Sequence, residues 1–506
     1  MSLLERNLPA LVVVLPLVGG LLAALVGRNG RAWWLALATS WLVFALVGWQ
    51  VHELLEVPGG VRSYTLGGWL PRTVEGVAGP VPVGIEYRID LANGLVLLVV
   101  SGIAAWTTLS ARAIVRREVP EDRLHFFYAV WLLCLTGLLG ITITGDAFNV
   151  YVLLEITSLT SYALIAMGKR SDRRALTASF HYLCMGTVGA SFFLLGLGYL
   201  LMATGTLNMV DMAHVLAERG ADRSVVVAYA LVVVGLCLKM GLFPLHQWLP
   251  NAYTYAPSAV TSFLASTATK VGVYVGLRFT FTIFLPGRVE HAAADALLAM
   301  SCVAIVYGSL RAVQQTNVKR LLAYSSVAQI GYMALGLALA SPLALAGALL
   351  HLLNHALVKG ALFVATSGVV YRTGSSRLAS FRGLFHAMPA SATILVLAGL
   401  GLVGVPLTGG FLSKWLLVSA ALEQGQWPVA VVVLLGSILA VVYVLRFLEP
   451  AIFGSREEAP QVSEAPLGVV VAGCALAAGS VYLGLYGAGV RELVEGAAQA
   501  LLRGAP

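Results

Sequence analysis

The chain has 506 residues, of which 59% are hydrophobic and only 11% are charged, with a net charge of +8. A soluble domain usually carries about 25% charged residues, so this composition excludes a water-soluble protein. The five cysteines lie far apart in apolar runs, which excludes a disulfide framework, a zinc site and an iron–sulfur motif.

Apolar runs long enough to cross a hydrocarbon core of roughly 30 Å recur from end to end. They predict an all-α polytopic membrane protein of about 14 transmembrane helices. The first run follows a short leader without a clear basic segment or cleavage site, so we interpret it as a retained helix rather than a signal peptide. The predicted spans are 9–27, 32–52, 90–111, 124–143, 149–168, 176–203, 225–249, 257–285, 292–310, 321–340, 343–371, 391–420, 428–447 and 467–489.

The loops between these spans differ in charge. Assigned alternately to two sides, they place 18 Lys and Arg residues on one side and nine on the other, and both termini fall on the second side. The positive-inside rule makes the basic side cytoplasmic. We therefore expect a multi-pass protein of the cell (cytoplasmic or inner) membrane with both termini on the outer side.

Within the spans, charge is rare and mostly positive. One acid, Glu155, lies clearly inside a span, so it can neutralise only one of the basic residues there. A charged side chain near a helix centre costs about 2.5–3.5 kcal/mol, and a desolvated ammonium gives up its proton more readily. A single such lysine can also be a structural ion pair, but several lysines with one acid favour a proton relay. The basic residues are Arg278, which lies near a span end and can extend to the interface, and the deeper Lys239, Lys270, Lys359 and Lys414.

Two histidines extend this pattern in the run HLLNHALVKGALF. His351, His355 and Lys359 are spaced at i, i+4 and i+8, so they lie on one face of a helix. A single buried histidine is more often a hydrogen-bonded packing residue. Three titratable groups on one face instead favour a relay, for which histidine is suited because it titrates near physiological pH.

Two spans contain a proline in mid-course. Pro244 follows Lys239, and Pro406 with Gly409–Gly410 precedes Lys414. Each proline removes a helical hydrogen bond, which in lipid requires compensation by other groups. An ordinary kink would have the same sequence, but here both breaks lie near an intramembrane lysine. They fall in spans 7 and 12, five apart, so spans 4–8 and 9–13 are predicted to be inverted repeats.

Four segments follow from these observations. We expect an N-terminal three-helix segment with an outer loop, two five-helix repeats, and a C-terminal helix with a short amphipathic tail. In this order, the segments are residues 1–111, 124–285, 292–447 and 467–506.

No P-loop, dinucleotide fingerprint or metal-spaced cluster occurs in the sequence. We therefore expect no cofactor and no metal, and a transporter subunit rather than an enzyme in its own right.

Over roughly 120–420 the chain resembles the antiporter-like subunits shared by respiratory complex I, membrane-bound hydrogenases and Mrp-type multisubunit Na⁺/H⁺ antiporters. The resemblance implies fourteen helices, inverted repeats and broken helices seven and twelve. The motifs that carry it are FNVYVLLEITSLTSYALIA, LKMGLFPLHQWLPNAYTYAPSAVTSFLAS, TKVGVY, VKRLLAYSSVAQIGY, HLLNHALVKGALF and GFLSKW.

The resemblance also implies residue roles. Glu155 and Lys239 match the family's Glu–Lys switch pair, and Lys270 matches its central relay lysine. His351, His355 and Lys359 would continue the path on helix eleven. Lys414 would be the terminal lysine facing the outer half-channel, and His246 on the broken helix would be a channel residue.

Within the family, the chain is most similar to the D-type subunits of Mrp antiporters. Lys414 disfavours complex I subunits with glutamate at that position, and the long lateral helix of the distal complex I subunit has no counterpart here. We therefore predict a proton-translocating subunit of a multisubunit monovalent cation (Na⁺)/H⁺ antiporter. The alternative is a homologous pumping subunit of a complex I-type NADH:quinone oxidoreductase or a membrane-bound hydrogenase. The expected partners are other complex subunits, protons, monovalent cations and the lipid bilayer, and no nucleic acid. In a third class, a passive scaffold, the lysines would be dispensable.

Overall fold

The computed structural model describes residues 3–27, 30–56, 60–68, 72–73, 80–81, 84–168, 173–220, 222–284 and 291–502. Over these residues the chain is almost entirely helical, as predicted. The helices are α1 (Leu3–Leu25), α2 (Arg31–Glu56), α3 (Leu91–Glu118), α4 (Leu124–Ile143), α5 (Ala147–Ala166), α6 (Arg174–Thr204), α7 (Met209–Arg219), α8 (Arg223–Met240), α9 (Trp248–Tyr255), α10 (Ser258–Arg278), α11 (His291–Val313), α12 (Val318–Leu339), α13 (Pro342–Thr373), α14 (Leu384–Ala387), α15 (Pro389–Val403), α16 (Gly409–Glu423), α17 (Trp427–Phe453), α18 (Leu467–Leu485) and α19 (Gly487–Leu502).

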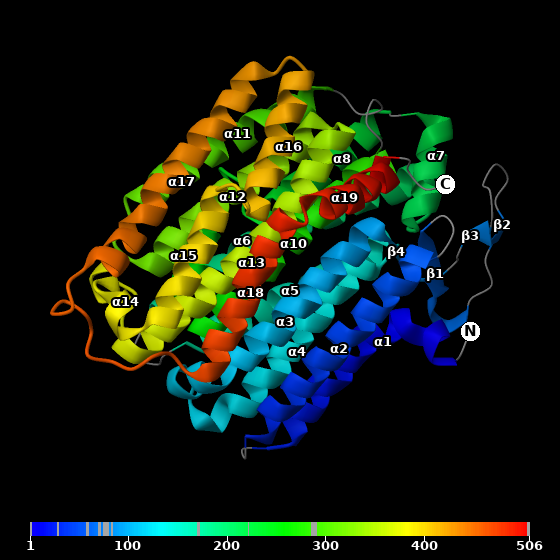
Figure 1. Cartoon of the computed structure of the whole chain (residues 1–506). Coiled ribbons are helices and arrows are strands. Elements are labelled where there is room, and N and C mark those ends of the chain that lie inside the picture. Colours follow the sequence, from blue (N-terminus) through cyan, green and yellow to red (C-terminus); the bar gives the residue numbers. More distant parts are fainter. Residues whose placement is uncertain are drawn as a thin grey trace.

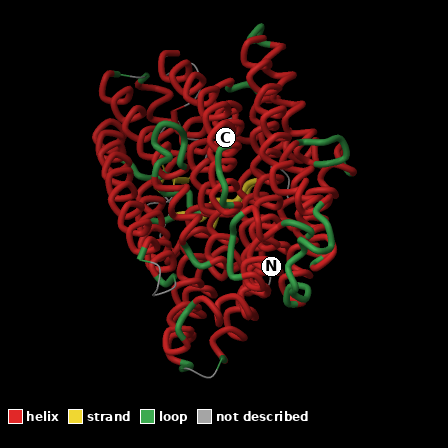
Figure 2. Tube along the Cα trace, turned by 90° about the vertical axis from the view of Figure 1, so that its left-hand side faces the viewer, coloured by secondary structure: helices red, strands yellow, loops and turns green. Residues whose placement is uncertain are grey.

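The strands are few and short. β1 (Val61–Thr65) pairs antiparallel with β4 (Glu86–Asp90), and β2 (Arg72–Thr73) pairs antiparallel with β3 (Pro80–Val81). They lie at the same end of the helix bundle as α7 and both marked chain ends, whereas α14 lies at the opposite end (Figure 1). Figure 2 shows the same bundle turned by 90°, with helices making up almost all of the chain.

Among the described helices, twelve are long and apolar enough to cross a membrane. These are α1–α6, α8, α11–α13, α17 and α18. Two further predicted spans are occupied by α10, which is 21 residues long, and by the consecutive helices α15 and α16. Together they give the predicted fourteen, and the expectation of an all-α polytopic membrane protein is confirmed.

Both predicted breaks are present, but a glycine ends the helix before the proline is reached. Gly241 caps α8 with φ 74°, and Gly404 caps α15 with φ 85°, a conformation that glycine adopts without steric cost. After each glycine the next amide turns back by five residues: Leu242 N–H donates to Cys237 O, and Val405 N–H donates to Leu400 O. The two helices therefore end with the same geometry, and the proline follows the end of each.

The two halves also share a connection. Asp146 caps the start of α5 and forms an isolated bridge to Asn208, which precedes α7. Asn317 caps the start of α12 in the same way and bridges to Arg377, a few residues before α14. Because α7 and α14 lie at opposite ends of the bundle (Figure 1), the two connections are inverted relative to each other, as expected for inverted repeats.

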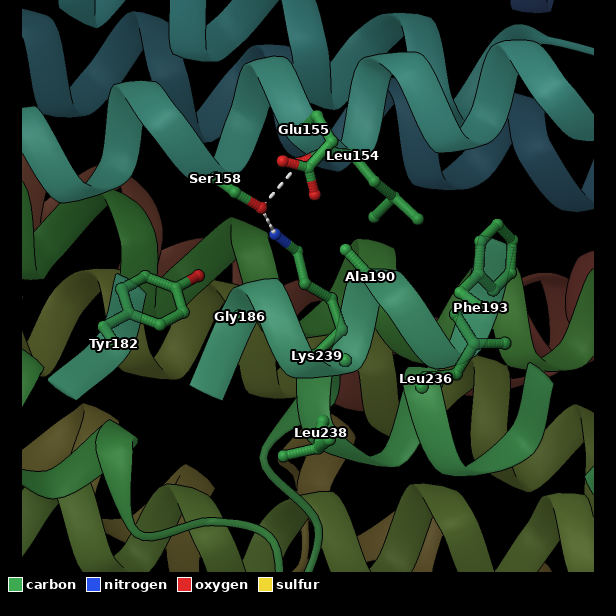
Figure 3. A pocket seen from close by; sticks show the side chains of 12 residues that line it. Leu154, Glu155, Ser158, Tyr182, Gly186, Ala190, Phe193, Leu236, Leu238 and Lys239 are labelled. Atoms are coloured by element: carbon green, nitrogen blue, oxygen red, sulfur yellow. Dashed lines mark hydrogen bonds between the residues drawn. The ribbon is translucent and has the colours of Figure 1, made fainter. Parts of the chain in front are cut away.

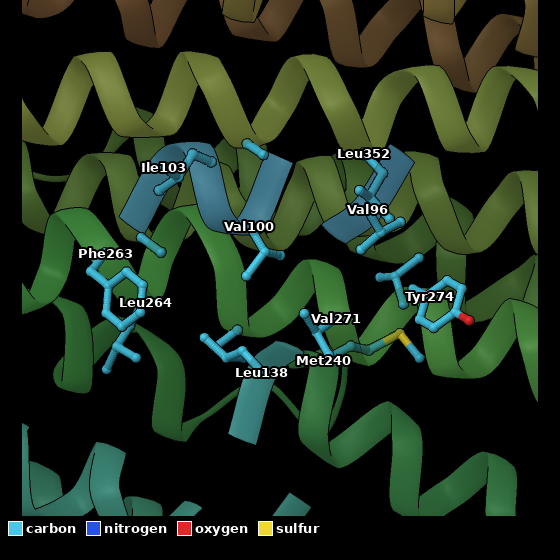
Figure 4. Close-up of a cluster of buried hydrophobic side chains, with 14 of the residues drawn as sticks. Val96, Val100, Ile103, Leu138, Met240, Phe263, Leu264, Val271, Tyr274 and Leu352 are labelled. Carbon is cyan, nitrogen blue, oxygen red and sulfur yellow. The ribbon is translucent and has the colours of Figure 1, made fainter. Parts of the chain in front are cut away.

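The interior of the bundle is built around α10, α12 and α13. All residues of α10 are buried, and so is most of the π-helical turn Phe279–Phe284 that follows it. Most of α13 is buried as well. Figure 4 shows apolar side chains of α10 packing against those of the neighbouring helices, among them Val100, Leu138, Met240, Phe263 and Leu352. The central helices carry Lys270 and Lys359, so these lysines face protein rather than lipid.

Arg278 was expected to be able to extend to the membrane interface, but it has an ion-pair partner within the protein. It is buried, and its guanidinium pairs with Asp90 at the start of α3, 2.6 Å away. The strand β4 brings this carboxylate to the end of α10, a contact that no local pattern predicts. Of the basic residues used to assign the two sides, Arg28, Lys169, Arg170, Arg288 and Arg503 lie outside the described residues.

Candidate functional site

Glu155 on α5 and Lys239 on α8 face each other across a small cavity (Figure 3). Lys239 Nζ donates to Ser158 Oγ at 2.5 Å, and Ser158 Oγ donates to the Leu154 carbonyl. The ammonium and the Glu155 carboxylate form no ion pair within the described residues, and Glu155 Oε1 has no hydrogen-bond partner there. The cavity between them, about 20 Å³, has room for one water molecule.

The two lysines at the centre of the bundle are fully buried and bind to backbone carbonyls. Lys270 on α10 donates to the Ala265 carbonyl, and Lys359 on α13 donates to the Leu322 carbonyl at 2.7 Å and to Ser325. A carbonyl accepts a hydrogen bond but carries no charge that could neutralise the ammonium. Both sites can therefore hold the lysine without fixing its charge.

The two histidines on α13 differ in their bonding. Both ring nitrogens of His351 are occupied, Nδ1 by Ser413 Oγ and Nε2 by Gln329 Oε1, each at 2.9 Å. Neither nitrogen of His355 has a partner among the described residues. The two rings are stacked with their centroids 6.1 Å apart, so the predicted common face of α13 is present.

Lys414 lies at the second helix break. Its ammonium donates to the Val403 carbonyl at 2.8 Å, in the last turn of α15, where carbonyls lack helical partners. It also lies 4.9 Å from the centre of the Tyr332 ring. That ring is 5.2 Å from the ring of His351, so one aromatic side chain separates Lys414 from the histidine face.

These contacts divide the predicted residues into three groups. His351, His355 and Lys359 lie on one face of α13, the Tyr332 ring lies between Lys414 and His351, and α10, which carries Lys270, packs against α13, so these five residues form one cluster. Glu155 and Lys239 line the same small cavity and form a second group.

His246 is separate from both groups. Its ring packs on Phe243 and Tyr307, whose ring centroids lie 5.5 and 5.2 Å away. The structure therefore does not bring His246 to the lysine cluster.

The neutral polar residues that bind the charged side chains were not among the predicted site residues. Ser158 lies one helical turn after Glu155, a spacing that indicates a shared face. Ser413 directly precedes Lys414, and Ser325 and Gln329 are spaced four apart within AYSSVAQIGY. These spacings could have marked Ser158 and Gln329 as candidates, but only tertiary structure shows which charged group each one contacts.

A comparison with known families matches residues 144–440 to the family described as NADH:quinone oxidoreductase/Mrp antiporter, transmembrane. The match covers more than half of the chain, including every predicted relay residue. The chain belongs to this family.

Curated members of the family are similar over nearly the whole chain. The N subunit of NADH-quinone oxidoreductase from Desulforudis audaxviator is 41% identical over 502 residues, which are 96% of each chain. The D subunit of the Na⁺/H⁺ antiporter from Bacillus subtilis is 27% identical over 90% of this chain and 89% of its own. Identity thus does not favour the predicted antiporter component over the alternative, a complex I-type component.

Solved structures of family members share the fold. A chain of the membrane-bound sulfane sulfur reductase, an archaeal respiratory membrane complex, superposes with a TM-score of 0.88 at 30% identity and covers 98% of both chains. A chain of the Mrp complex from Dietzia sp. DQ12-45-1b has a TM-score of 0.85 at 26% identity and covers 99% of this chain and 100% of its own. These relatives are subunits of multisubunit membrane complexes.

Proposed function

We propose that this protein is a proton-translocating subunit of a multisubunit membrane complex. The observation that carries the proposal is the buried cluster of Lys270, Lys359, Lys414 and two histidines, whose ammonium groups bind to carbonyls and hydroxyls rather than to acids. Groups held in this way can be protonated or neutral without breaking an ion pair, which is what a relay requires. A purely structural role would favour paired charges.

Glu155 and Lys239 would act as a switch at one end of the relay. Because a cavity and Ser158 separate the carboxylate from the ammonium, a small movement of either can change their attraction. The proton would pass from Lys239 to Lys270, then along the face of α13 to Lys414. His246, which contacts neither group, would serve as an entry residue on the broken helix.

We further propose that the complex is redox-driven, of the complex I kind. The 41% identity to the oxidoreductase N subunit over 96% of both chains favours this alternative, against 27% for the antiporter D subunit. The similarity to the sulfane sulfur reductase chain supports the same class. Sodium/proton antiport within an Mrp-type complex is the second candidate, and it is supported by the TM-score of 0.85 with the Mrp chain.

Substitution within the assembled complex tests the relay. In inverted membrane vesicles that carry the whole complex, we expect Lys239→Ala, Glu155→Gln and Lys414→Ala each to reduce driven proton uptake at least about tenfold. Arg491→Ala, on the exposed face of α19, is the control and should leave uptake unchanged. Full proton uptake in the three relay variants would instead support a passive scaffold.

The subunit composition of the complex distinguishes a redox-driven complex from a sodium/proton antiporter. After mild solubilisation, mass spectrometry of the tagged complex should identify iron–sulfur subunits with quinone- or sulfur-reactive partners. Small hydrophobic antiporter subunits, together with sodium-driven proton movement, would favour the second candidate instead.

We also propose that the protein lies in the cell membrane with both termini on the outer side. The support is the excess of basic residues in the loops of the opposite side. Alkaline phosphatase is active only outside the cytoplasm, so a fusion after residue 502 should be active and a fluorescent-protein fusion at the same site dark. The reverse result would invert the assignment.

A further inference from the structure

His351 lies in a buried line of neutral polar groups contributed by three other helices. Gln329 of α12 binds one side of its ring, Ser413 of α16 binds the other, and Tyr443 of α17 lies behind Gln329. Gln329, His351, Ser413 and Tyr443 are all at most 2% exposed. Each of these groups has a known number of hydrogens and lone pairs, so the donor and the acceptor of each contact can be assigned.

The Gln329 side determines where His351 keeps its permanent proton. Gln329 Oε1 is an acceptor only, so the ring atom facing it at 2.9 Å, Nε2, must carry a hydrogen. In this orientation of the amide, the nitrogen of Gln329 donates to the Tyr443 hydroxyl at 3.4 Å and the oxygen faces the ring. Neutral His351 is thus the Nε2–H form, and Nδ1 is the atom that gains and loses a proton.

On the other side of the ring, the Ser413 hydroxyl has one hydrogen and two possible acceptors for it. Ser413 Oγ lies 2.9 Å from His351 Nδ1 and 3.1 Å from the Gly410 carbonyl. When Nδ1 is bare, the hydroxyl can donate to it. When Nδ1 is protonated, it donates to Oγ, and the hydroxyl must turn to the Gly410 carbonyl. The carbonyl therefore provides a place for the serine hydrogen in the second state.

We propose that Gln329 and Ser413 restrict proton exchange at His351 to Nδ1, with Ser413 Oγ as the link to the side of α16 where Lys414 lies. In the transfer, the Lys414 ammonium gives up one proton, which reaches Oγ as the serine's own proton moves to Nδ1, so that the lysine becomes neutral and the ring carries the positive charge. The new hydroxyl hydrogen then points to the Gly410 carbonyl, and it returns to Nδ1 only after Nδ1 has lost its proton. Gln329 is a positioning residue in this scheme, since it acts through the tautomer of His351.

This inference rests on the proposed proton relay, and serine variants separate the two. In vesicles with the whole complex, Ser413→Ala should reduce driven proton uptake at least about tenfold, and Ser413→Thr, which keeps the hydroxyl, should stay within about threefold. Ser419→Ala on the same helix is the matched control and should be unchanged. Normal uptake in Ser413→Ala, or equal loss in Ser413→Thr, would overturn the inference. Normal uptake in Lys239→Ala and Lys414→Ala would instead overturn the proposed function.

A spectroscopic measurement does not depend on how the Ser413 variants fold. The ring vibrations of neutral histidine differ between the Nε2–H and Nδ1–H forms. Infrared difference spectra of the histidine-labelled complex should contain a signal of the Nε2–H form that is absent in His351→Ala. In Gln329→Met, which has a similar volume but no amide, this signal should shift toward the Nδ1–H form. A wild-type signal of the Nδ1–H form, or no change in Gln329→Met, would contradict the assignment.

Discussion

At the scale of single residues, the buried lysines are bound by atoms that carry no full charge. Lys414 binds the carbonyl end of α15, where the helix dipole is negative and the last carbonyls lack helical partners. Lys359 binds one carbonyl and one serine. Such partners satisfy the hydrogen bonds of an ammonium while its charge remains largely uncompensated, so the positions are costly for stability.

Replacement of one such lysine should therefore separate stability from transport. Lys359→Met has a similar volume and no charge, so we expect proton uptake to be lost and the melting temperature to stay equal or to rise. Vesicle uptake and thermal unfolding of the purified complex measure the two effects. Lys359→Ala is the comparison, because the cavity it leaves should lower the melting temperature. Proton uptake that persists in Lys359→Met would contradict the role of this lysine.

The pair of Asp90 and Arg278 should make stability depend on pH. Burial alone would raise the pKa of Asp90, but the nearby guanidinium of Arg278, with the Asn93 amide, holds this pKa below its ordinary value. The stabilisation is complete above the ordinary pKa of about 3.9 and is lost as the pH falls below it. We expect the melting temperature to fall with acidification below about pH 4.

The variant Asp90→Asn should remove this acid-dependent fall. It should also cost about 3–5 kcal/mol near neutral pH, because it leaves a buried guanidinium without its ion-pair partner. Thermal unfolding as a function of pH measures both effects. Asp122→Asn on the exposed segment before α4 is the control and should change neither. An unchanged pH profile in Asp90→Asn would assign the acid sensitivity to another group.

At the scale of helices, the second break depends on close backbone contact. A Cβ added at Gly410, at the start of α16, would lie 2.1 Å from the Gly401 carbonyl of α15. Backbone atoms in packed helices cannot move aside as a flexible side chain can. The small residues thus allow the two halves of the broken helix to pass each other and keep Lys414 against α15.

Two alanine substitutions compare this contact with an open site. Gly410→Ala should destabilise the protein by about 1–3 kcal/mol or more and reduce proton uptake, because α15 and α16 must separate. Gly198→Ala, within α6 and with no atom within 4 Å of the added Cβ, should be neutral or stabilising by up to about 1 kcal/mol. Chemical denaturation measures the difference. Equal stability of the two variants would show that the break tolerates separation.

The last helix, α19, is amphipathic and packs its apolar face on α13 and α3. Val494 is fully buried on this face, whereas Gln499 is exposed. We expect Val494→Asp to cost on the order of 3–5 kcal/mol, since it buries an unpaired charge, and Gln499→Asp to change stability by less than about 0.5 kcal/mol. Thermal unfolding compares the two; a small effect of Val494→Asp would mean that α19 detaches readily.

At the scale of the whole molecule, burial is graded from the centre outward. α10, α12 and α13 are almost wholly buried, whereas α6 and α17 expose apolar side chains such as Leu195 and Ile438. The lysines and histidines on the central helices are thus kept from lipid by the helices that pack around them. This arrangement explains why a chain with few charges can hold four deep lysines.

Several features were predictable because they depend on properties local in sequence. The length and hydropathy of each run set the spans, and the deep lysines were evident because charged residues are rare within these spans. The spacing of His351, His355 and Lys359 defined a helix face. The positions of the breaks were also predicted, although the proline was identified as their cause and a glycine in fact ends each helix.

The partners of these residues were decided by tertiary structure. Lys239 binds Ser158, 81 residues away, rather than Glu155 directly, and Arg278 pairs with Asp90 across 188 residues. Such contacts depend on how neighbouring helices are rotated and offset along their axes, which hydropathy does not specify, since many rotations bury a similar apolar area. The sequence therefore determined which charges lie in the membrane, and the packing of the helices decided which neutral groups hold them.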